Sequence, residues 1–174
     1  MNDTESDVVA ITQLVNLYGL AVDSQRWELF DRIFTPDVDA DYGATSHWTD
    51  RERFKGDFAA FHAPFDSTQH TMSTHVVRVD GDRAYSFCNG GWRLVRHAAA
   101  GGPLWDGTGW YDATLLRTSG GWRITRRVCR VTWWTGNPLV NETISGVKFE
   151  LATTVLRREA AAGRVAILAT VDGA

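Results

Sequence analysis

The sequence predicts a single α+β domain in which a curved antiparallel sheet wraps around N-terminal helices to form a cone. Two observations indicate this fold. Apolar residues in the first third recur at spacings of three and four, which is typical of helices, whereas residues 68–134 divide into long strands separated by short turns. A length of 174 residues fits one domain spanning 1–174, with a core at 5–135 and a partly helical extension at 137–174.

Helices are expected before the sheet. The first, over 4–22, would bury one stripe of apolar side chains along its length. This stripe consists of Val8, Ile11, Val15, Tyr18 and Val22. The other elements expected here are helices over 27–34 and 50–61, with a short strand over 38–42 between them.

Four strands, the last three of them long, are expected to form most of the sheet. They cover 68–79, 84–97, 104–118 and 122–134. Gly90 and Gly91 interrupt the second of these strands, which indicates a bulge with strong curvature. After Pro138 the pattern becomes helical again over 146–162, whereas 164–174 carries no pattern that assigns a structure.

Composition excludes several classes of function. The net charge is −3 with scattered arginines, and no apolar run approaches the roughly 20 residues of a membrane span, so neither nucleic acid nor membrane is an expected partner. The acidic N-terminus does not resemble a signal peptide, and Cys88 and Cys129 are expected to be reduced thiols of a cytoplasmic protein. Eight tryptophans suit a large apolar cavity or an interface, and predict a homo-oligomer, a dimer or higher, formed through the outer sheet face.

Asp23 is the most informative polar residue, because it lies where the first helix ends. A carboxylate at a helix C-terminus faces the negative end of the helix dipole, where a basic residue is the usual choice. One interpretation is that Asp23 merely opens the turn before Arg26. The other is that it points into a pocket and pairs with a histidine.

The order of elements resembles the nuclear transport factor 2-like (cystatin-like) superfamily, and its details resemble the SnoaL-like branch. Three segments carry the resemblance: 18–23 at the end of the first helix, 69–84 with its histidine strand, and the start of the last strand at 121–124. That branch includes lyases such as lindane dehydrochlorinase, scytalone dehydratase and bile acid 7α-dehydratase. The resemblance covers residues 5–135.

The resemblance implies an Asp-His pair made of Asp23 and His70, with Tyr18 as a further catalytic residue. It also implies a cavity arginine at Arg127, for which Arg126 and Arg130 are alternatives because the strand register is uncertain by one residue. Tyr18 lies on the apolar stripe, so it is either a core residue or a catalytic one. The expected substrate-binding aromatics are Trp27, Phe54, Phe58, Trp92, Trp105 and Trp110. Trp92 stands where the bile acid enzyme has a further acid, so its leaving-group chemistry does not transfer.

An aspartate behind a histidine makes a general base, because it fixes the imidazole tautomer and stabilises the imidazolium. The sequence therefore predicts a lyase (dehydratase) or isomerase that acts without a cofactor on a hydrophobic cyclic, polyketide-like or steroid-like molecule. Two alternatives stay open: a non-catalytic ligand-binding or polyketide-cyclase-like module, and a small structural subunit of a ring-hydroxylating dioxygenase. No cysteine or histidine spacing indicates a metal site.

Three other histidines are expected to be structural or solvated. His75 lies five residues from His70, so strand alternation would place it on the opposite face, in a structural or interfacial role. His47 and His62 fall in loop or helix-end settings and are expected to be solvated.

Overall fold

The computed structural model describes residues 3–147 and 151–171 and has the expected α+β architecture. The helical elements before the long strands are α1 (Asp3–Asp23), the 3-10 helix η1 (Trp27–Leu29), α2 (Phe30–Ile33) and α3 (Arg51–His62). The strands are β1 (Phe34–Asp41), β2 (His47–Trp48), β3 (Ser67–Asp80), β4 (Arg83–Val95), β5 (Leu104–Thr118) and β6 (Gly121–Gly136). After them come η2 (Pro138–Asn141), α4 (Leu156–Ala161) and α5 (Ala166–Val171).

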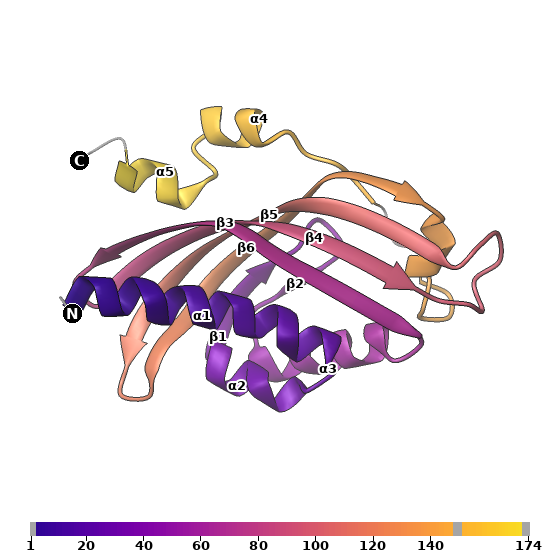
Figure 1. Cartoon of the computed structure of the whole chain (residues 1–174), viewed down its shortest axis with the longest axis horizontal. Helices are drawn as coiled ribbons and strands as arrows, with labels where there is room; N and C mark the ends of the chain where they lie inside the picture. The colour runs from indigo at the N-terminus through magenta and orange to yellow at the C-terminus, as the bar shows by residue number, and fades with distance from the viewer. Residues whose placement is uncertain (1–2, 148–150, 172–174) are drawn as a thin grey trace.

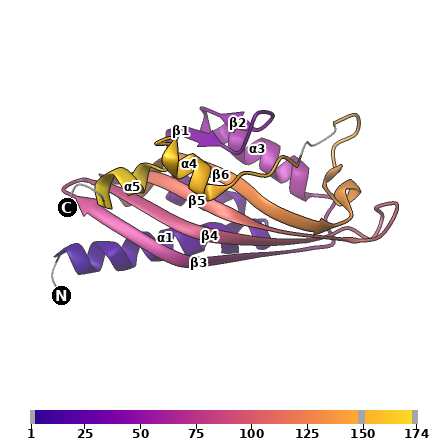
Figure 2. The same ribbon diagram turned by 90° about the horizontal axis from the view of Figure 1, so that it is seen from above.

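The strands form one curved sheet with the order β2-β1-β6-β5-β4-β3. All neighbouring pairs are antiparallel except β1 and β6, which are parallel. Helices α1, α2 and α3 lie against one face, and α4 and α5 lie against the other (Figure 1). The same division is visible from above, where α4 and α5 lie over the strands (Figure 2); α5 contacts β3, β4 and β5. The predicted cone with helices inside it is confirmed.

The core lies between the inner face of the sheet and the helices. Four members of the predicted stripe of α1 are at most 3% exposed: Ile11, Val15, Tyr18 and Val22. Around them pack Phe30, Phe34 and Phe54, whose ring centres lie 5.2–5.3 Å apart. Burying each such ring stabilises the fold by about 1.5–3 kcal/mol. The end of α1, and with it Asp23, is therefore firmly placed against the sheet.

A bulge in β3 overturns the expected position of His75. The pairing of β3 with β4 shifts between Ser73 and Val76, and Thr74 has a positive φ of 54°. Two residues of β3 therefore face one residue of β4, which resets the alternation. His75 consequently shares the inner face with His70, and the prediction of opposite faces is wrong.

Glycines in β4 and β5 leave space for aromatic side chains, and Gly90 and Gly91 do not form the predicted bulge. The register of β4 with both neighbours is continuous at these two residues, so the predicted bulge is wrong. A Cβ atom on Gly90 would lie 2.6 Å from the Tyr111 ring, and one on Gly107 would collide with the Trp105 ring. These glycines therefore allow large aromatic side chains to lie flat across neighbouring strands.

The C-terminal segment differs from its prediction. No helix spans 146–162 in the described residues; α4 covers only Leu156–Ala161, and α5 lies in the part that had no assignment. The β-branched run Thr153, Thr154 and Val155 favours an extended chain, and Thr154 N donates to Val131 O at 2.7 Å. Asp112, buried in β5, accepts the Ala166 and Ile167 N–H groups of α5. Helix α5 thereby covers part of the outer sheet face that was expected to form an interface.

Candidate active site

The carboxylate of Asp23 and the imidazole of His70 form a hydrogen-bonded pair at the inner face of the sheet. His70 Nδ1 lies 2.6 Å from Asp23 Oδ1, and the backbone N–H of His70 donates to Asp23 Oδ2 at 2.7 Å. Thr68 Oγ1 donates to Asp23 Oδ1 at 2.8 Å. The contact between these two residues that the sequence predicted is therefore present.

The electrostatics of the pair fix the histidine tautomer. Burial raises the pKa of Asp23, but the hydrogen bonds from His70 and Thr68 outweigh burial, and the net pKa is lowered. An ionised carboxylate accepts a proton-bearing nitrogen, so Nδ1 carries the proton. Nε2, which has no hydrogen-bond partner among the described residues, is then the lone-pair nitrogen. The His70 side chain is only 6% exposed.

Three tyrosines and an arginine lie beside the pair. Tyr18, whose ring centre is 6.2 Å from that of His70, accepts a hydrogen bond from Tyr42 at 3.1 Å. The Arg127 guanidinium carbon lies 3.8 Å from the Tyr18 ring centre and 3.9 Å from that of Tyr111. Burial raises the pKa of Tyr18 to about 12, although the Arg127 charge opposes this rise. All three phenols, whose pKa values are raised, are thus neutral hydrogen-bond donors at physiological pH.

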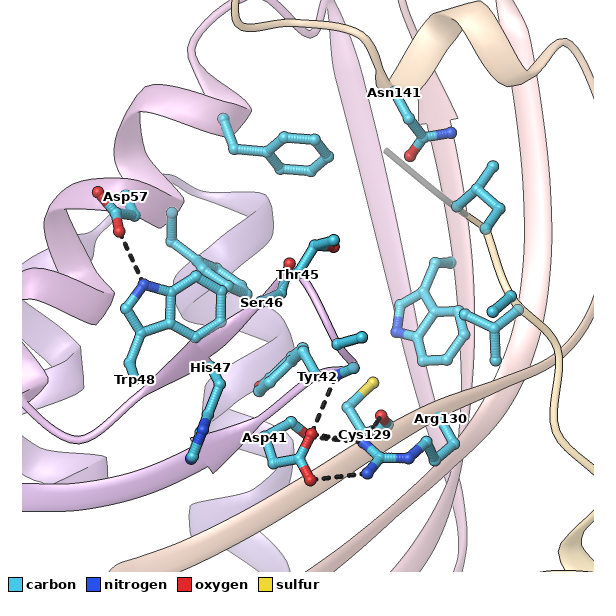
Figure 3. A pocket seen from close by; sticks show the side chains of 18 of the residues that line it. Asp41, Tyr42, Thr45, Ser46, His47, Trp48, Asp57, Cys129, Arg130 and Asn141 are labelled. Atoms are coloured by element: carbon cyan, nitrogen blue, oxygen red, sulfur yellow. Dashed lines mark hydrogen bonds and ion pairs between the residues drawn. The ribbon is translucent and has the colours of Figure 1, made fainter. Parts of the chain in front are cut away.

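A cavity of about 860 Å³ opens above these residues. Tyr18, His70 and Tyr111 line its inner part, and the turn between β1 and β2 lines its rim. At that rim Trp48 donates to Asp57 at 2.7 Å, and Arg130 bonds Asp41 (Figure 3). The volume falls within the range of about 300–1,000 Å³ that is usual for small-molecule sites.

His62 also lines the cavity, which contradicts the expectation that it is solvated. It ends α3, is 3% exposed, and bonds the Phe58 carbonyl through Nδ1 at 2.7 Å. Burial lowers its pKa to about 4. His62 is therefore a neutral cavity residue that the sequence missed, because only packing of the helix end against Trp27 and Phe65 buries it. His47, as expected, is exposed.

Within the described ranges, no group of three or more His, Cys, Asp or Glu side chains is placed to hold a metal ion. The same residues contain no helix with the length and apolar character needed to cross a membrane. Cys88 and Cys129 are both free and buried.

A family model for the SnoaL-like domain matches residues 3–128. The chain belongs to the SnoaL-like family. An uncharacterized protein of Mycobacterium tuberculosis is 36% identical over 124 residues, which cover 71% of this chain and 84% of that protein. The family relationship is therefore seen both in the domain match and in a relative aligned over most of its length.

Solved structures agree on the fold of this SnoaL-like chain. A protein from Kribbella flavida superposes with a TM-score of 0.74 and 24% identity over 79% of this chain and 98% of that one. A putative scytalone dehydratase from Novosphingobium aromaticivorans superposes with a TM-score of 0.70 and 23% identity, and the match covers 78% of this chain and 91% of that one. A hexachlorocyclohexane dehydrochlorinase has the same fold, with a TM-score of 0.69 and 16% identity over 85% of this chain and 95% of that one. So does the β subunit of a putative aromatic-ring-hydroxylating dioxygenase from N. aromaticivorans, with a TM-score of 0.63 and 17% identity over 75% of this chain and 92% of that one.

Half of the aromatic residues predicted to bind substrate line the cavity of the SnoaL-like domain. Phe58, Trp92 and Trp105 do so. Phe54 is fully buried in the core instead, and Trp27 packs between Phe30 and His62. Phe54 is therefore a core residue of α3, and Trp27, which begins η1, is partly buried and packs against the core. Neither residue lines the cavity, contrary to the prediction.

Trp110 lies on the outer face of the sheet, so its predicted place in the cavity is wrong. It packs with Val128, Val165 and Ile167 beneath α5. Trp105 and Trp110 are five positions apart on β5, and an odd separation in a strand puts two side chains on opposite faces. The parity of the sequence itself thus excludes one of them from the cavity.

The three candidate arginines of β6 lie in different places. Arg127, 1% exposed, lies beneath the tyrosines and does not line the cavity. Arg126 faces the outer side, 3.9 Å from Asp112, and Arg130 reaches the cavity rim but is paired with Asp41 at 2.7 Å. The cavity arginine that the resemblance implied is therefore not Arg127. Of the two alternatives, Arg130 lines the cavity, and its charge is already paired with Asp41.

Proposed function

We propose that this protein is a lyase or isomerase that removes a proton from a hydrophobic cyclic small molecule through the Asp23–His70 pair. One observation carries the proposal: His70 donates Nδ1–H to Asp23 at 2.6 Å, which leaves Nε2 as a base inside an aromatic cavity. A positioned base of this kind contributes roughly 10²–10⁴-fold to a reaction rate. The expected cytoplasmic location and independence from cofactors stay part of the proposal.

The reaction begins when Nε2 takes a proton from a carbon next to a carbonyl. The electron pair of the C–H bond moves onto the carbonyl oxygen and gives an enolate, while Asp23 stabilises the imidazolium. The Tyr18 hydroxyl accepts from Tyr42 and keeps its own proton to donate to the enolate oxygen. Arg127 contacts the ring of Tyr18 and adds positive potential without touching the substrate.

Two outcomes are open to the enolate. If the β-carbon carries a hydroxyl, the enolate expels it, and the proton on His70 converts hydroxide into water, which is a dehydration. If it does not, His70 returns the proton to another carbon, which is an isomerisation. A putative scytalone dehydratase shares this fold, which supports dehydration as the outcome. The likeness extends only to the fold, so isomerisation stays open as well.

The alternatives make different use of the same fold. A binding module would hold the ligand without proton transfer. A subunit like the dioxygenase β subunit would require a large partner chain. The tight hydrogen bonding of Asp23 by three donors favours the enzyme, because a carboxylate that orients an imidazole and stabilises its protonated form is the arrangement of a general base.

Deuterium exchange tests the proposal without knowledge of the natural substrate. In D₂O, the protein should accelerate exchange of the acidic C–H protons of 1-tetralone, a bicyclic ketone, as followed by NMR. His70→Ala should reduce the rate to that of buffer, and His75→Ala, on the same face of β3, serves as the matched control. Binding of 1-tetralone without any acceleration would favour the binding module.

A further inference from the structure

We propose that Asn141 and Trp105 form a second binding subsite in the cavity, which takes a hydrogen-bond-accepting oxygen of the ligand at the end remote from His70. The proposal deepens the proposed function by assigning a second polar anchor to the same ligand. It depends on the cavity being the ligand site and not on any chemistry at His70.

The first observation is a pair of unsatisfied donors. Among the described residues, side-chain nitrogens that are buried and lack a hydrogen-bond partner belong to Trp105, Trp110, Arg127 and Asn141. Trp110 lies on the outer face and Arg127 lies beneath the tyrosines, but Trp105 and Asn141 both line the cavity. Their side chains are well buried, at 3% and 4% exposure. Neither nitrogen is accessible to water in this structure. Leaving a buried donor unpaired is unfavourable, so a rotation of either side chain toward the cavity that let its nitrogen donate to a ligand oxygen would be compensated by that hydrogen bond.

Local structure holds these two residues at the same end of the cavity. The Asn137 backbone N–H donates to the Leu104 carbonyl at 2.8 Å, and the Asn137 side chain caps η2 by accepting from Leu139 N. This attaches η2, which ends at Asn141, to the start of β5 beside Trp105. Figure 3 shows Asn141 across the cavity from Trp48 and Asp57.

The surroundings define the chemistry of the ligand atom. Leu94, Ile144 and Leu151 make the neighbouring wall apolar. An indole N–H can only donate, whereas the Asn141 amide can present either its oxygen or its nitrogen after rotation. The group shared between them must therefore be an acceptor, such as a carbonyl or ether oxygen, on an otherwise apolar ligand.

Strand geometry gives the length of that ligand. His70 pairs with Trp92 on β4, and Trp92 pairs with Gly107 on β5, two residues beyond Trp105. Two strand spacings and two residues correspond to about 12 Å between the backbones at His70 and Trp105. A ligand that reaches from the base to this subsite is therefore about the size of a substituted bicyclic or tricyclic ring system.

A pair of matched probes tests the subsite by binding alone. 2-Acetylnaphthalene carries a carbonyl oxygen, and 2-isopropenylnaphthalene has nearly the same shape without an acceptor. Titration followed by tryptophan fluorescence should show the ketone binding roughly 5–10-fold more tightly than the alkene, as one to two added hydrogen bonds allow. Asn141→Leu and Trp105→Phe should each reduce this preference, with alkene affinity changed less than about threefold. Leu139→Ala, an exposed position of the same η2, should preserve it.

Other results overturn the subsite. Equal affinities in the unaltered protein would do so, as would a preference that survives in both variants. A preference lost in Tyr18→Phe but kept in Asn141→Leu would place the oxygen at the His70 end, which contradicts the subsite and leaves the proposed function intact. If neither probe binds, the cavity is not a site for apolar ligands of this size, and the subsite fails with it. Circular dichroism on each variant separates these outcomes from loss of fold.

Discussion

The guanidinium of Arg127 stacks on the ring of Tyr18, with 3.8 Å between its central carbon and the ring centre, and no hydrogen-bond partner for its nitrogens exists among the described residues. A buried cation without an anion is costly unless aromatic faces stabilise it, and Tyr111 supplies a second face at 3.9 Å. The arrangement concentrates positive potential behind the phenols that face the cavity. Negative charge that develops on a ligand beside Tyr18 would be stabilised from beneath.

Replacing Arg127 by methionine separates this electrostatic role from packing. Arg127→Met should leave the free energy of unfolding in urea within about 1 kcal/mol, or raise it, because an apolar side chain of similar volume replaces an uncompensated charge. The same variant should slow 1-tetralone exchange roughly 10-fold or more if the charge supports the enolate. A loss of several kcal/mol in stability would instead indicate that the guanidinium has an anionic partner.

Gly107→Ala should disturb the cavity through Trp105. A Cβ atom at this position would collide with the Trp105 ring, so the ring must leave its place across the strand. We expect a loss of about 1–3 kcal/mol of stability together with weaker ketone binding. Gly91→Ala is the control, because its Cβ would meet only Thr71 Cβ at an ordinary 3.7 Å. Equal effects of the two substitutions would show that the glycines serve the backbone and not the rings.

We expect the stability of the protein to depend on pH through His62. Its folded pKa of about 4 lies below the ordinary 6.5, so between these values the unfolded chain takes up a proton that the folded chain excludes. Stability should therefore fall as pH decreases from about 6.5 to 4, by roughly 3 kcal/mol. His62→Gln should flatten this part of the profile, as measured by urea unfolding at a series of pH values. An unchanged slope in the variant would assign the dependence to other groups.

The sequence was sufficient for the fold and for the central pair. The 3–4 periodicity of α1 predicted its buried stripe. The position of Asp23 after that stripe left two interpretations open, and the family resemblance named His70 as the partner. The face of the sheet to which each strand side chain points was harder to predict, because one extra residue in a strand exchanges the two faces for all residues after it. The bulge near Thr74 brought His75 to the inner face, and no residue type in that segment indicates it.

The missed parts of the site come from contacts between distant segments. Tyr42 and Tyr111 join Tyr18 only because the turn after β1 and the strand β5 both border the same space. Asn141 reaches it from a segment that the sequence pattern assigned to no element. Their burial is a property of the assembled cavity and not of local sequence. Trp110 is different, since its odd separation from Trp105 already excluded it from one shared face.

Assembly as a homodimer stays a prediction, now confined to the part of the outer face that α5 leaves free. Trp133, 52% exposed, lies on that face because Trp134, its neighbour, packs on Trp105 from the inside. Light scattering should give twice the 19.4 kDa chain mass, and Trp133→Asp should lower it. Leu20→Asp, at an exposed position of α1, should not. A monomer at micromolar concentration in the unaltered protein would contradict the prediction.

The central claim is that Asp23 and His70 act as one general base, and a double-mutant cycle on the rate of deuterium exchange into 1-tetralone tests it most directly. Asp23→Asn and His70→Ala should each reduce the enzyme-dependent rate roughly 10²–10⁴-fold, and the double variant should be no slower than the worse single variant. Full additivity of the two losses, or a His70→Ala variant that keeps its folded structure and its exchange rate, would contradict the claim.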